Sequence, residues 1–308
     1  MGQVIVIAGP TCAGKSETAI ALARMVGGEI VSADSMQVYR GMDIGTAKLS
    51  IEDRRGIPHH MIDVADPDED YNVSRYTEAA LSAIDDISFR GKVPIITGGS
   101  GFYIDALLYE QPGTEPGTDP ELRESLKKRV SMGELAELYR ELECLDPEYA
   151  SSVHPNNRVR IIRALEYIKT TGSPYSEYTG ARADARPRFD HRFFILDDDR
   201  DELYARIDAR VDAMIAGGIL GEVRTLIKKG IGRDTVSMQG VGYRQMFDYI
   251  SGDITLDDAV DSMKKETRHI AKRQLTWLRR IPDAEWIGVG NYVRDPESIA
   301  RYILGRLS

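Results

Sequence analysis

The stretch from residue 9 to residue 16 restricts the fold more than any other part of the 308-residue chain. It follows an apolar run over residues 4–8, precedes a helical pattern that extends to about Val26, and reads Gly9-Pro10-Thr11-Cys12-Ala13-Gly14-Lys15-Ser16. This is the G-x-x-x-x-G-K-[ST] pattern of a phosphate-binding loop, in which backbone N–H groups and a lysine contact phosphate oxygens and a hydroxyl, here that of Ser16, binds Mg²⁺. Because such a loop joins a strand to a helix, the sequence predicts an α/β fold, a P-loop NTPase-like parallel sheet flanked by helices.

The length and composition of the chain limit its number of domains, its cellular location and its cysteine chemistry. A hydrophobic content of 42% supports a large core, and the length suggests one large or two modest domains. The first apolar run is too short to span a bilayer, and neither a secretory cleavage site nor a myristoylation signal is present, so we expect a cytoplasmic protein without a membrane partner. The two cysteines, Cys12 and Cys144, predict neither a disulfide framework nor a metal site.

Two further strand patterns end in polar residues. The strand expected over residues 29–33 ends at Asp34, and the strand over residues 93–97 runs into a glycine-rich turn that contains Ser100. Carboxyl ends of parallel strands share one edge of a sheet, so Asp34 is expected to face the phosphate loop as a general base or magnesium partner, with a plain turn or cap role as the alternative. The second strand lacks the terminal carboxylate of most P-loop hydrolases, which favours a loop that binds a phosphate chain without hydrolysing it.

The middle of the chain reads as a helical insertion. Residues 112–120 and 180–187 have linker-like composition, and helical patterns lie between them. We therefore predict an α/β core formed by residues 1–111 and 190–308 and a helical insertion domain formed by residues 112–189. Arginines of the insertion offer contacts to a phosphate backbone, with a solvated surface as the alternative for each of them: Arg123, Arg158, Arg160 and Arg163.

The C-terminal part contains a basic helix that the net charge of −9 conceals. A helical pattern from about residue 256 to residue 281 has an apolar stripe, and it sets one acid, Glu266, against the cations Lys264, Lys265, Arg268, Lys272, Arg273, Arg279 and Arg280. A solvated helix more often mixes both signs, so this face favours RNA contact. The net charge itself argues against nucleic-acid binding by the whole surface.

Other segments carry polar residues in suggestive patterns. The acidic run at residues 197–199 is expected to begin a helix on which Arg206 and Arg210 share one face. Residues 237–245 place two glycines, one of them Gly240, before Tyr243 and Arg244, which predicts close backbone approach, stacking and phosphate pairing. Metal binding by the adjacent residues 59–60, both histidine, is disfavoured because neighbouring side chains point in different directions.

The phosphate loop together with residues 34–39, 43–48, 237–245 and 272–279 resembles the tRNA dimethylallyltransferase family, also called tRNA isopentenyltransferases, in its short bacterial form without a zinc-finger extension. The resemblance covers nearly the whole chain. It implies transfer of a dimethylallyl group from dimethylallyl diphosphate to the exocyclic amine of the adenosine 3′ of the anticodon, with release of pyrophosphate. The implied partners are the tRNA anticodon stem-loop and the donor, the implied cofactor is Mg²⁺, and a monomer is the working expectation.

The resemblance also assigns roles to residues. In the resembled family a threonine that helps to hold the reacting groups stands where this chain has Ser100, and the arginine equivalent to Arg210 contacts the donor's pyrophosphate. From its position at the strand end, Asp34 is the candidate base, and the loop from Gly9 to Ser16 is expected to bind the same pyrophosphate. Together, the resemblance and the patterns described above predict tRNA contacts by Asp34, Ser35, Met36, Gln37, Ser100, Arg123, Arg158, Arg160, Arg163, Gly240, Tyr243, Arg244, Lys265, Lys272 and Arg273.

Three other functions remain open at this stage. An adenylate prenyltransferase of the cytokinin type would use a free nucleotide, a P-loop small-molecule kinase would use Asp34 to activate a hydroxyl, and an RNA-binding NTPase would lack transfer chemistry. The missing strand-end carboxylate weighs against the last two. The basic helix and the arginines of the insertion weigh against a free-nucleotide acceptor.

Overall fold

A computed structural model describes residues 3–110, 119–183 and 186–307 of the chain. They divide into two compact units. One comprises Met1–Leu108 and Phe189–Ser308 and is called the α/β unit below, and the other comprises Tyr109–Arg188 and is called the helical unit. Most of the linker-like segment predicted at residues 112–120 lies outside the described residues. The segment predicted at residues 180–187 begins inside a helix that extends to Ala183.

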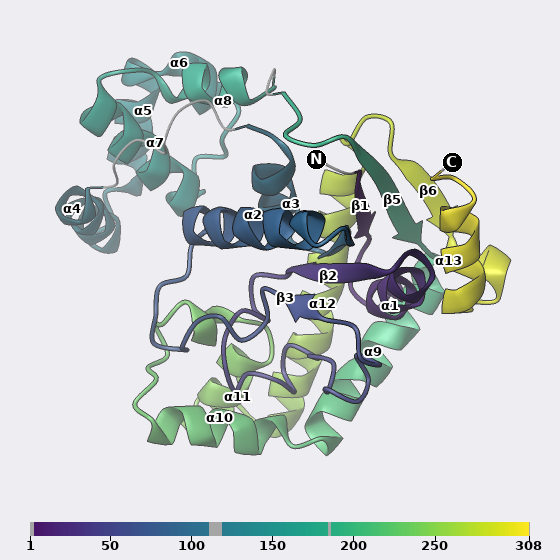
Figure 1. Ribbon diagram of the computed structural model, residues 1–308. Helices are drawn as coiled ribbons and strands as arrows, with labels where there is room; N and C mark the ends of the chain where they lie inside the picture. Colours follow the sequence, from purple (N-terminus) through teal and green to yellow (C-terminus); the bar gives the residue numbers. More distant parts are fainter. Residues whose placement is uncertain (1–2, 111–118, 184–185, 308) are drawn as a thin grey trace. The chain divides into compact units, whose positions relative to one another are not determined.

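A six-stranded parallel sheet forms the centre of the α/β unit, in the order β3-β2-β4-β1-β5-β6 (Figure 1). The strands are β1 (Val4–Ala8), β2 (Gly28–Ala33), β3 (His59–His60), β4 (Val93–Gly98), β5 (His191–Asp197) and β6 (Glu285–Gly288). The predicted parallel sheet is confirmed. The strands β3 and β6 were not predicted, because each is too short to show a strand pattern in the sequence.

Helices cover the sheet, which explains why its central strands are continuous apolar runs. Ile5 and Ile7 of β1 belong to a core cluster with α1 (Lys15–Val26) and α13 (Pro296–Leu304), whereas Val6, on the opposite face of β1, is also fully buried. The helices α2 (Val73–Phe89) and α3 (Gly101–Leu108) pack on each other and on β2 and β4. The short helix η2 (Val289–Tyr292) precedes α13.

Four helices of the α/β unit lie between β5 and β6 in sequence (Figure 1), and the first and last of them line the cavity described below. They are α9 (Arg200–Ala216), α10 (Ile219–Lys228), α11 (Tyr243–Ile250) and α12 (Leu256–Leu278), with the short η1 (Ser237–Gln239) before α11. As predicted, the acidic run begins α9, where the Asp199 side chain caps the first turn. Among the described residues, no helix combines the length and apolar character needed to span a bilayer.

The helical unit has its own core. It contains α4 (Pro120–Ser131), α5 (Leu135–Leu145), α6 (Pro147–Ser151), α7 (Arg158–Thr171) and α8 (Tyr175–Ala183). Leu126, Leu138, Leu142, Ile161 and Leu165 meet in its centre. Side chains of Asp119, Asp146 and Asn157 accept hydrogen bonds from backbone N–H groups at the starts of α4, α6 and α7, so each of these helices begins at a capped residue.

Candidate active site

The carboxyl ends of three neighbouring strands lie at one level of the sheet. Ala8 of β1 pairs with Gly98 of β4, and Gly98 pairs in turn with Ala33 of β2. The next residues of these strands begin the phosphate loop, the Gly99–Ser100 turn and the Asp34–Gln37 turn. Since β1 is flanked by β4 on one side and β5 on the other, this edge is also the point where the strand order reverses, the usual place for a ligand in such sheets.

The phosphate loop adopts a conformation that depends on its glycines. Gly14 lies in the left-handed region with φ 82° and is followed by the first turn of α1. A Cβ atom at Gly9 would lie 2.5 Å from the carbonyl oxygen of Leu196, so β5 leaves no room for a side chain there. The loop therefore sits tightly between β1, β5 and the start of α1.

Lys15 lies in the wall of the site. Its Nζ donates a hydrogen bond to the carbonyl oxygen of Pro10 at 2.6 Å, so the side chain folds back over the loop. Burial, assisted by the positive charge of Arg210, lowers the pKa of Lys15 to about 8. An anion bound in the loop would restore the missing counter-charge, which makes this lysine suited to a diphosphate.

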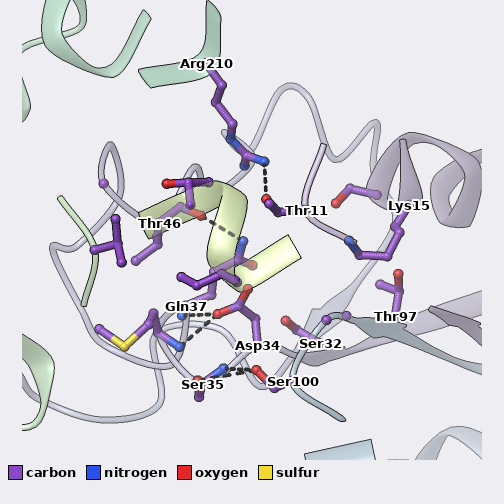
Figure 2. Close-up of a pocket in the computed structure, with 18 of the residues that line it drawn as sticks. Thr11, Lys15, Ser32, Asp34, Ser35, Gln37, Thr46, Thr97, Ser100 and Arg210 are labelled. Atoms are coloured by element: carbon purple, nitrogen blue, oxygen red, sulfur yellow. Dashed lines mark hydrogen bonds between the residues drawn. The ribbon is translucent and has the colours of Figure 1, made fainter. Parts of the chain in front are cut away.

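The two arginines of α9 both reach the phosphate loop but serve different purposes. Arg210 donates from its guanidinium to the Thr11 hydroxyl at 3.2 Å and faces the cavity (Figure 2). Arg206 donates to the carbonyl oxygen of Cys12 at 3.0 Å and forms an ion pair with the buried Asp198. Arg206 thus braces the loop, while Arg210 is available to a ligand.

A cavity of about 240 Å³ opens at the strand ends. Lys15, Asp34 and Arg210 point toward it from three different elements (Figure 2). Its polar lining comes from the phosphate loop and the strand-end turns, and its apolar lining includes Leu49, Ile207, Val211, Met214, Val241, Met263 and Ile270. A second cavity of about 610 Å³ lies along the phosphate loop and shares the polar residues Lys15, Ser16 and Arg210, and the apolar Leu49, with the first. A charged group held by the shared residues can therefore have an apolar chain on the side of the first cavity.

Asp34 holds a turn, as the alternative reading of its sequence position suggested, and it also lines the cavity. Its Oδ1 accepts hydrogen bonds from the backbone N–H groups of Met36 at 2.9 Å and Gln37 at 3.3 Å, which is the geometry of an aspartate-stabilised turn. Within the described parts of the chain, no hydrogen bond involves Oδ2, and the side chain lines the first cavity. The turn therefore orients the carboxylate through one oxygen and leaves the other oxygen without a hydrogen-bond partner among the described residues.

Ser100 fixes the neighbouring turn instead of standing free. Its hydroxyl oxygen accepts from the backbone N–H of Ser35 at 3.0 Å, and it lies 3.3 Å from the Ser35 hydroxyl (Figure 2). Gln37 donates to the carbonyl oxygen of Thr46 at 3.2 Å. The turn after Asp34 is thus connected both to the end of β4 and to the loop over residues 43–48.

The loop over residues 43–48 is held by one carboxylate that the sequence analysis did not single out. Glu222 of α10 accepts hydrogen bonds from the backbone N–H groups of residues 43, 44 and 45 at 2.8, 2.8 and 3.2 Å, and from the Tyr243 hydroxyl at 2.6 Å. The Tyr243 ring packs so close to Gly45 that a Cβ atom there would lie 2.5 Å from it. The sequence gives no indication of this contact, because a single glutamate on an amphipathic helix does not reveal which loop it will bind.

Comparison with known proteins decides the family. A family model described as IPP transferase matches residues 37–281, and one described as Isopentenyl transferase matches residues 2–61. The tRNA dimethylallyltransferase of Pelotomaculum thermopropionicum is 46% identical over 301 residues, covering 97% of this chain and 95% of that protein. The chain belongs to the tRNA dimethylallyltransferase family. A second relative of that name, from Geobacillus kaustophilus, is 41% identical over 308 residues, covering 99% of this chain and 97% of its own length.

Solved structures agree with this assignment. The full-length tRNA isopentenylpyrophosphate transferase of Bacillus halodurans has a TM-score of 0.74 and 38% identity, and the match covers 100% of this chain and 97% of that one. A eukaryotic dimethylallyltransferase described as acting on tRNA has a TM-score of 0.77 and 32% identity, with coverage of 90% and 70%. The predicted P-loop NTPase-like fold is thereby confirmed.

Members of the tRNA dimethylallyltransferase family must contact RNA, and the structure separates the predicted contacts into available and engaged side chains. On α12, Lys264 pairs with Asp212 at 2.6 Å and Arg268 pairs with Asp208 of α9. These two cations are therefore largely neutralised, contrary to the even basic face that the sequence suggested. In the described chain, the cations of this stretch that are exposed and without a recorded ion pair are Lys265, Lys272, Arg273, Arg279 and Arg280.

The segment at residues 237–245 differs from its prediction. Tyr243 is only 1% exposed and its hydroxyl is bound to Glu222, so its ring is a core side chain and not a stacking platform. Arg244 forms an ion pair with Glu266 at 2.6 Å, which also neutralises the one acid of the basic stretch. At Gly240, a Cβ atom would lie 2.5 Å from Cε of Met36, so a side chain there would displace the end of the Met36 side chain. The close backbone approach was predicted correctly, although its partner is Met36.

The arginines of the helical unit also divide into two groups. Arg123 makes a bidentate contact with the fully buried Glu166, with Nη2 at 2.9 Å from Oε2, and Arg163 lies 3.5 Å from the same carboxylate. These two arginines therefore stabilise the unit itself. Arg158 and Arg160 are exposed in the first turn of α7, where no ion pair to either is recorded within the described residues.

The adjacent histidines have structural partners. His60 Nε2 lies 2.8 Å from an Oε2 of Glu29, which also binds Arg90, and His59 Nδ1 lies 2.8 Å from the carbonyl oxygen of Ile57. The hydrogen bonds from Arg90 lower the pKa of Glu29 to about 2, with His60 adding to the shift. This cluster ties β2, β3 and the end of α2 together and gives the two histidines a structural role.

Proposed function

We propose that this chain transfers a dimethylallyl group from dimethylallyl diphosphate to the exocyclic amine of the adenosine 3′ of the anticodon in tRNA. The observation that carries the proposal is the convergence of Lys15, Arg210 and Asp34 on one cavity with apolar walls. The cations bind a diphosphate, the apolar walls accept a short prenyl chain, and the carboxylate accepts a proton. The names of the relatives supply tRNA as the acceptor.

The transfer forms one bond, breaks another and moves one proton. The adenosine amine attacks the first carbon of the dimethylallyl group, the bond from that carbon to the diphosphate oxygen breaks, and the electron pair leaves with pyrophosphate. Asp34 takes the proton that the amine loses, through the oxygen that the turn leaves free. Lys15, Arg210 and the loop N–H groups stabilise the negative charge that develops on the leaving group.

We propose Mg²⁺ as the metal, held partly by the donor. The Ser16 hydroxyl and the Asp34 carboxylate line the same cavity, and over the described residues no group of three or more His, Cys, Asp or Glu side chains forms a protein-only site. This donor set fits Mg²⁺, which commonly binds through one or two protein oxygens, substrate phosphates and water. When bound, the ion neutralises charge on the departing pyrophosphate.

The decisive experiment combines the full chain with dimethylallyl diphosphate, Mg²⁺ and unmodified tRNA, and analyses nucleosides by mass spectrometry. Prenylated adenosine at the position 3′ of the anticodon is the expected product. Transfer to free AMP in preference to tRNA would replace this proposal with a cytokinin-type activity. ATP-dependent phosphorylation of a small molecule would replace it with a kinase.

A further inference from the structure

One amide side chain joins two of the three turns at the catalytic edge. Gln274, on α12, accepts a hydrogen bond at its Oε1 from the backbone N–H of Thr11 at 2.8 Å. Its Nε2 donates to the carbonyl oxygen of Gly99 at 3.1 Å. The phosphate loop and the turn after β4 are therefore connected through a residue that lies more than 170 positions away in sequence from either.

The surroundings are shaped for this side chain. A Cβ atom at Gly99 would lie 2.2 Å from the Nε2 atom of Gln274, and one at Gly101 would lie 2.3 Å from the ring of Trp277, one turn later on α12. Both glycines thus let α12 approach the turn closely. Only a side chain with a donor and an acceptor can serve Gly99 and Thr11 together, since a carboxylate lacks the donor and an apolar chain lacks both.

Thr11 is held from two sides, because its hydroxyl also accepts from Arg210. Its position determines where the loop, and with it a bound diphosphate, lies relative to the Ser100 and Asp34 turns across the cavity. In-line transfer requires the reacting atoms to be about 3–3.5 Å apart, and a displacement of about 1 Å can lower the rate by about 10²-fold. Small movements of the loop are therefore expected to affect transfer more than binding of the acceptor.

We propose that Gln274 is a positioning residue that locks the phosphate loop to the Gly99 turn and so sets the distance between the donor and the acceptor base. The inference rests on the proposed function. Gln274 acts through Thr11 and Gly99. Nothing in the chemistry of the transfer requires its amide to exchange a proton.

The first test replaces Gln274 with Met, which keeps the volume but removes both hydrogen bonds. We expect kcat to fall about 10²-fold and the affinity for inorganic pyrophosphate to fall about tenfold, with tRNA affinity within about twofold of the parent. Asp257→Asn, an exposed change near the start of the same helix and away from the exposed cations, is the control and should leave all three values unchanged. Equal losses in tRNA and pyrophosphate binding by Gln274→Met would indicate general disruption and overturn the proposal.

The second test uses the close contact with Gly99. In the parent protein, the Cβ atom added by Gly99→Ala would collide with the Gln274 amide. The loss of kcat caused by Gly99→Ala should therefore match the loss caused by Gln274→Met. In a Gln274→Ala background the space is open, because the next atom, the carbonyl oxygen of Gly9, would be 3.5 Å away. The additional effect of Gly99→Ala should then be less than about twofold. Multiplicative effects of the two changes would overturn the proposal even if one variant folds poorly.

The two proposals fail in different ways. A parent protein that binds pyrophosphate but does not prenylate tRNA contradicts the proposed function, while the pyrophosphate affinities of the Gln274 and Gly99 variants still decide whether the amide orders the loop. A parent that prenylates tRNA as fast as its Gln274→Met variant supports the proposed function and refutes the positioning role.

Discussion

At the scale of single residues, the site works because backbone geometry orients a few side chains before any ligand arrives. The Asp34 turn exposes one carboxylate oxygen to the cavity, and Arg210 is held on Thr11. Such preorganisation is what allows fixed charges to act on a developing charge without reorganising.

The substitution Asp34→Asn tests whether Asp34 is the general base of the transfer. The amide keeps an oxygen for the turn but cannot take a proton, so kcat should fall by roughly 10²–10⁴ while tRNA binding is retained. Single-turnover prenylation and tRNA affinity, measured side by side, check this. Turnover close to that of the parent would remove Asp34 from the role of base.

Lys15 predicts a pH dependence of donor binding. Its pKa in the free site is about 8 because of burial and of Arg210, and a bound diphosphate favours the charged form and so raises that pKa. Donor affinity should therefore be constant below about pH 8 and fall by up to about tenfold per pH unit above it. Calorimetry with dimethylallyl diphosphate between about pH 7.5 and 9.5 measures this. Lys15→Arg, which stays protonated, should abolish the dependence, and an unchanged profile in that variant would assign the titration to another group.

At the scale of elements, α12 presents different groups of side chains on two of its faces. One face directs Gln274 to the phosphate loop, and another presents exposed cations that include Lys272 and Arg273. The pairing of Lys264 and Arg268 with α9 fixes the helix in place. Only the cations without such partners remain fully available for an RNA backbone.

Reversing Lys265, Lys272 and Arg273 to Glu tests that surface. Each phosphate contact contributes about 0.7–0.9 to the slope of log affinity against log salt, so the variant should bind tRNA more weakly and with a flatter slope, while donor affinity changes little. A charge-matched control reverses Arg224, Lys228 and Lys229, which are exposed on or next to α10. If both triple variants lose tRNA affinity equally, the effect is net charge and α12 is not a specific contact surface.

At the scale of the whole molecule, two units with separate cores share one chain. The α/β unit contains every residue that lines the two cavities described above. The helical unit is stabilised internally by the buried Glu166 and its two arginines.

Glu166→Ala should therefore destabilise the helical unit alone. Glu166 is fully buried, whereas the side chains of Arg123 and Arg163 are partly exposed and can be hydrated, so the loss should be smaller than for a fully buried pair, about 1–3 kcal/mol. Hydrogen exchange should show lost protection in α4 and α7 with unchanged protection in β1 and β4. Glu124→Ala, which breaks an exposed pair with Lys127, should change stability by less than about 1 kcal/mol. Uniform loss of protection across both units would show that they unfold together.

Much of this architecture was predictable from local patterns. The strand before the phosphate loop, the helices α4 to α7 and the long basic helix all follow from spacing within about twenty residues, whereas α8 was missed. β3 and β6 did not follow, because a two-residue or four-residue strand is defined by its neighbour in the sheet and not by its own composition. The prediction of an uninterrupted basic face failed for the same kind of reason, since the partners of two of its cations, Asp208 and Asp212, lie on another helix.

The sequence by itself determined the phosphate loop, the parallel sheet and the family, because a glycine pattern and an apolar run specify backbone conformation over a few residues. Only the tertiary structure decided which polar groups meet. The common level of Ala8, Gly98 and Ala33, the burial of Tyr243 and the reach of Gln274 to Thr11 depend on strand register and helix packing between distant segments. Hydrogen bonds and ion pairs act over a few ångströms in space, and the spacing of residues along a chain does not encode such distances.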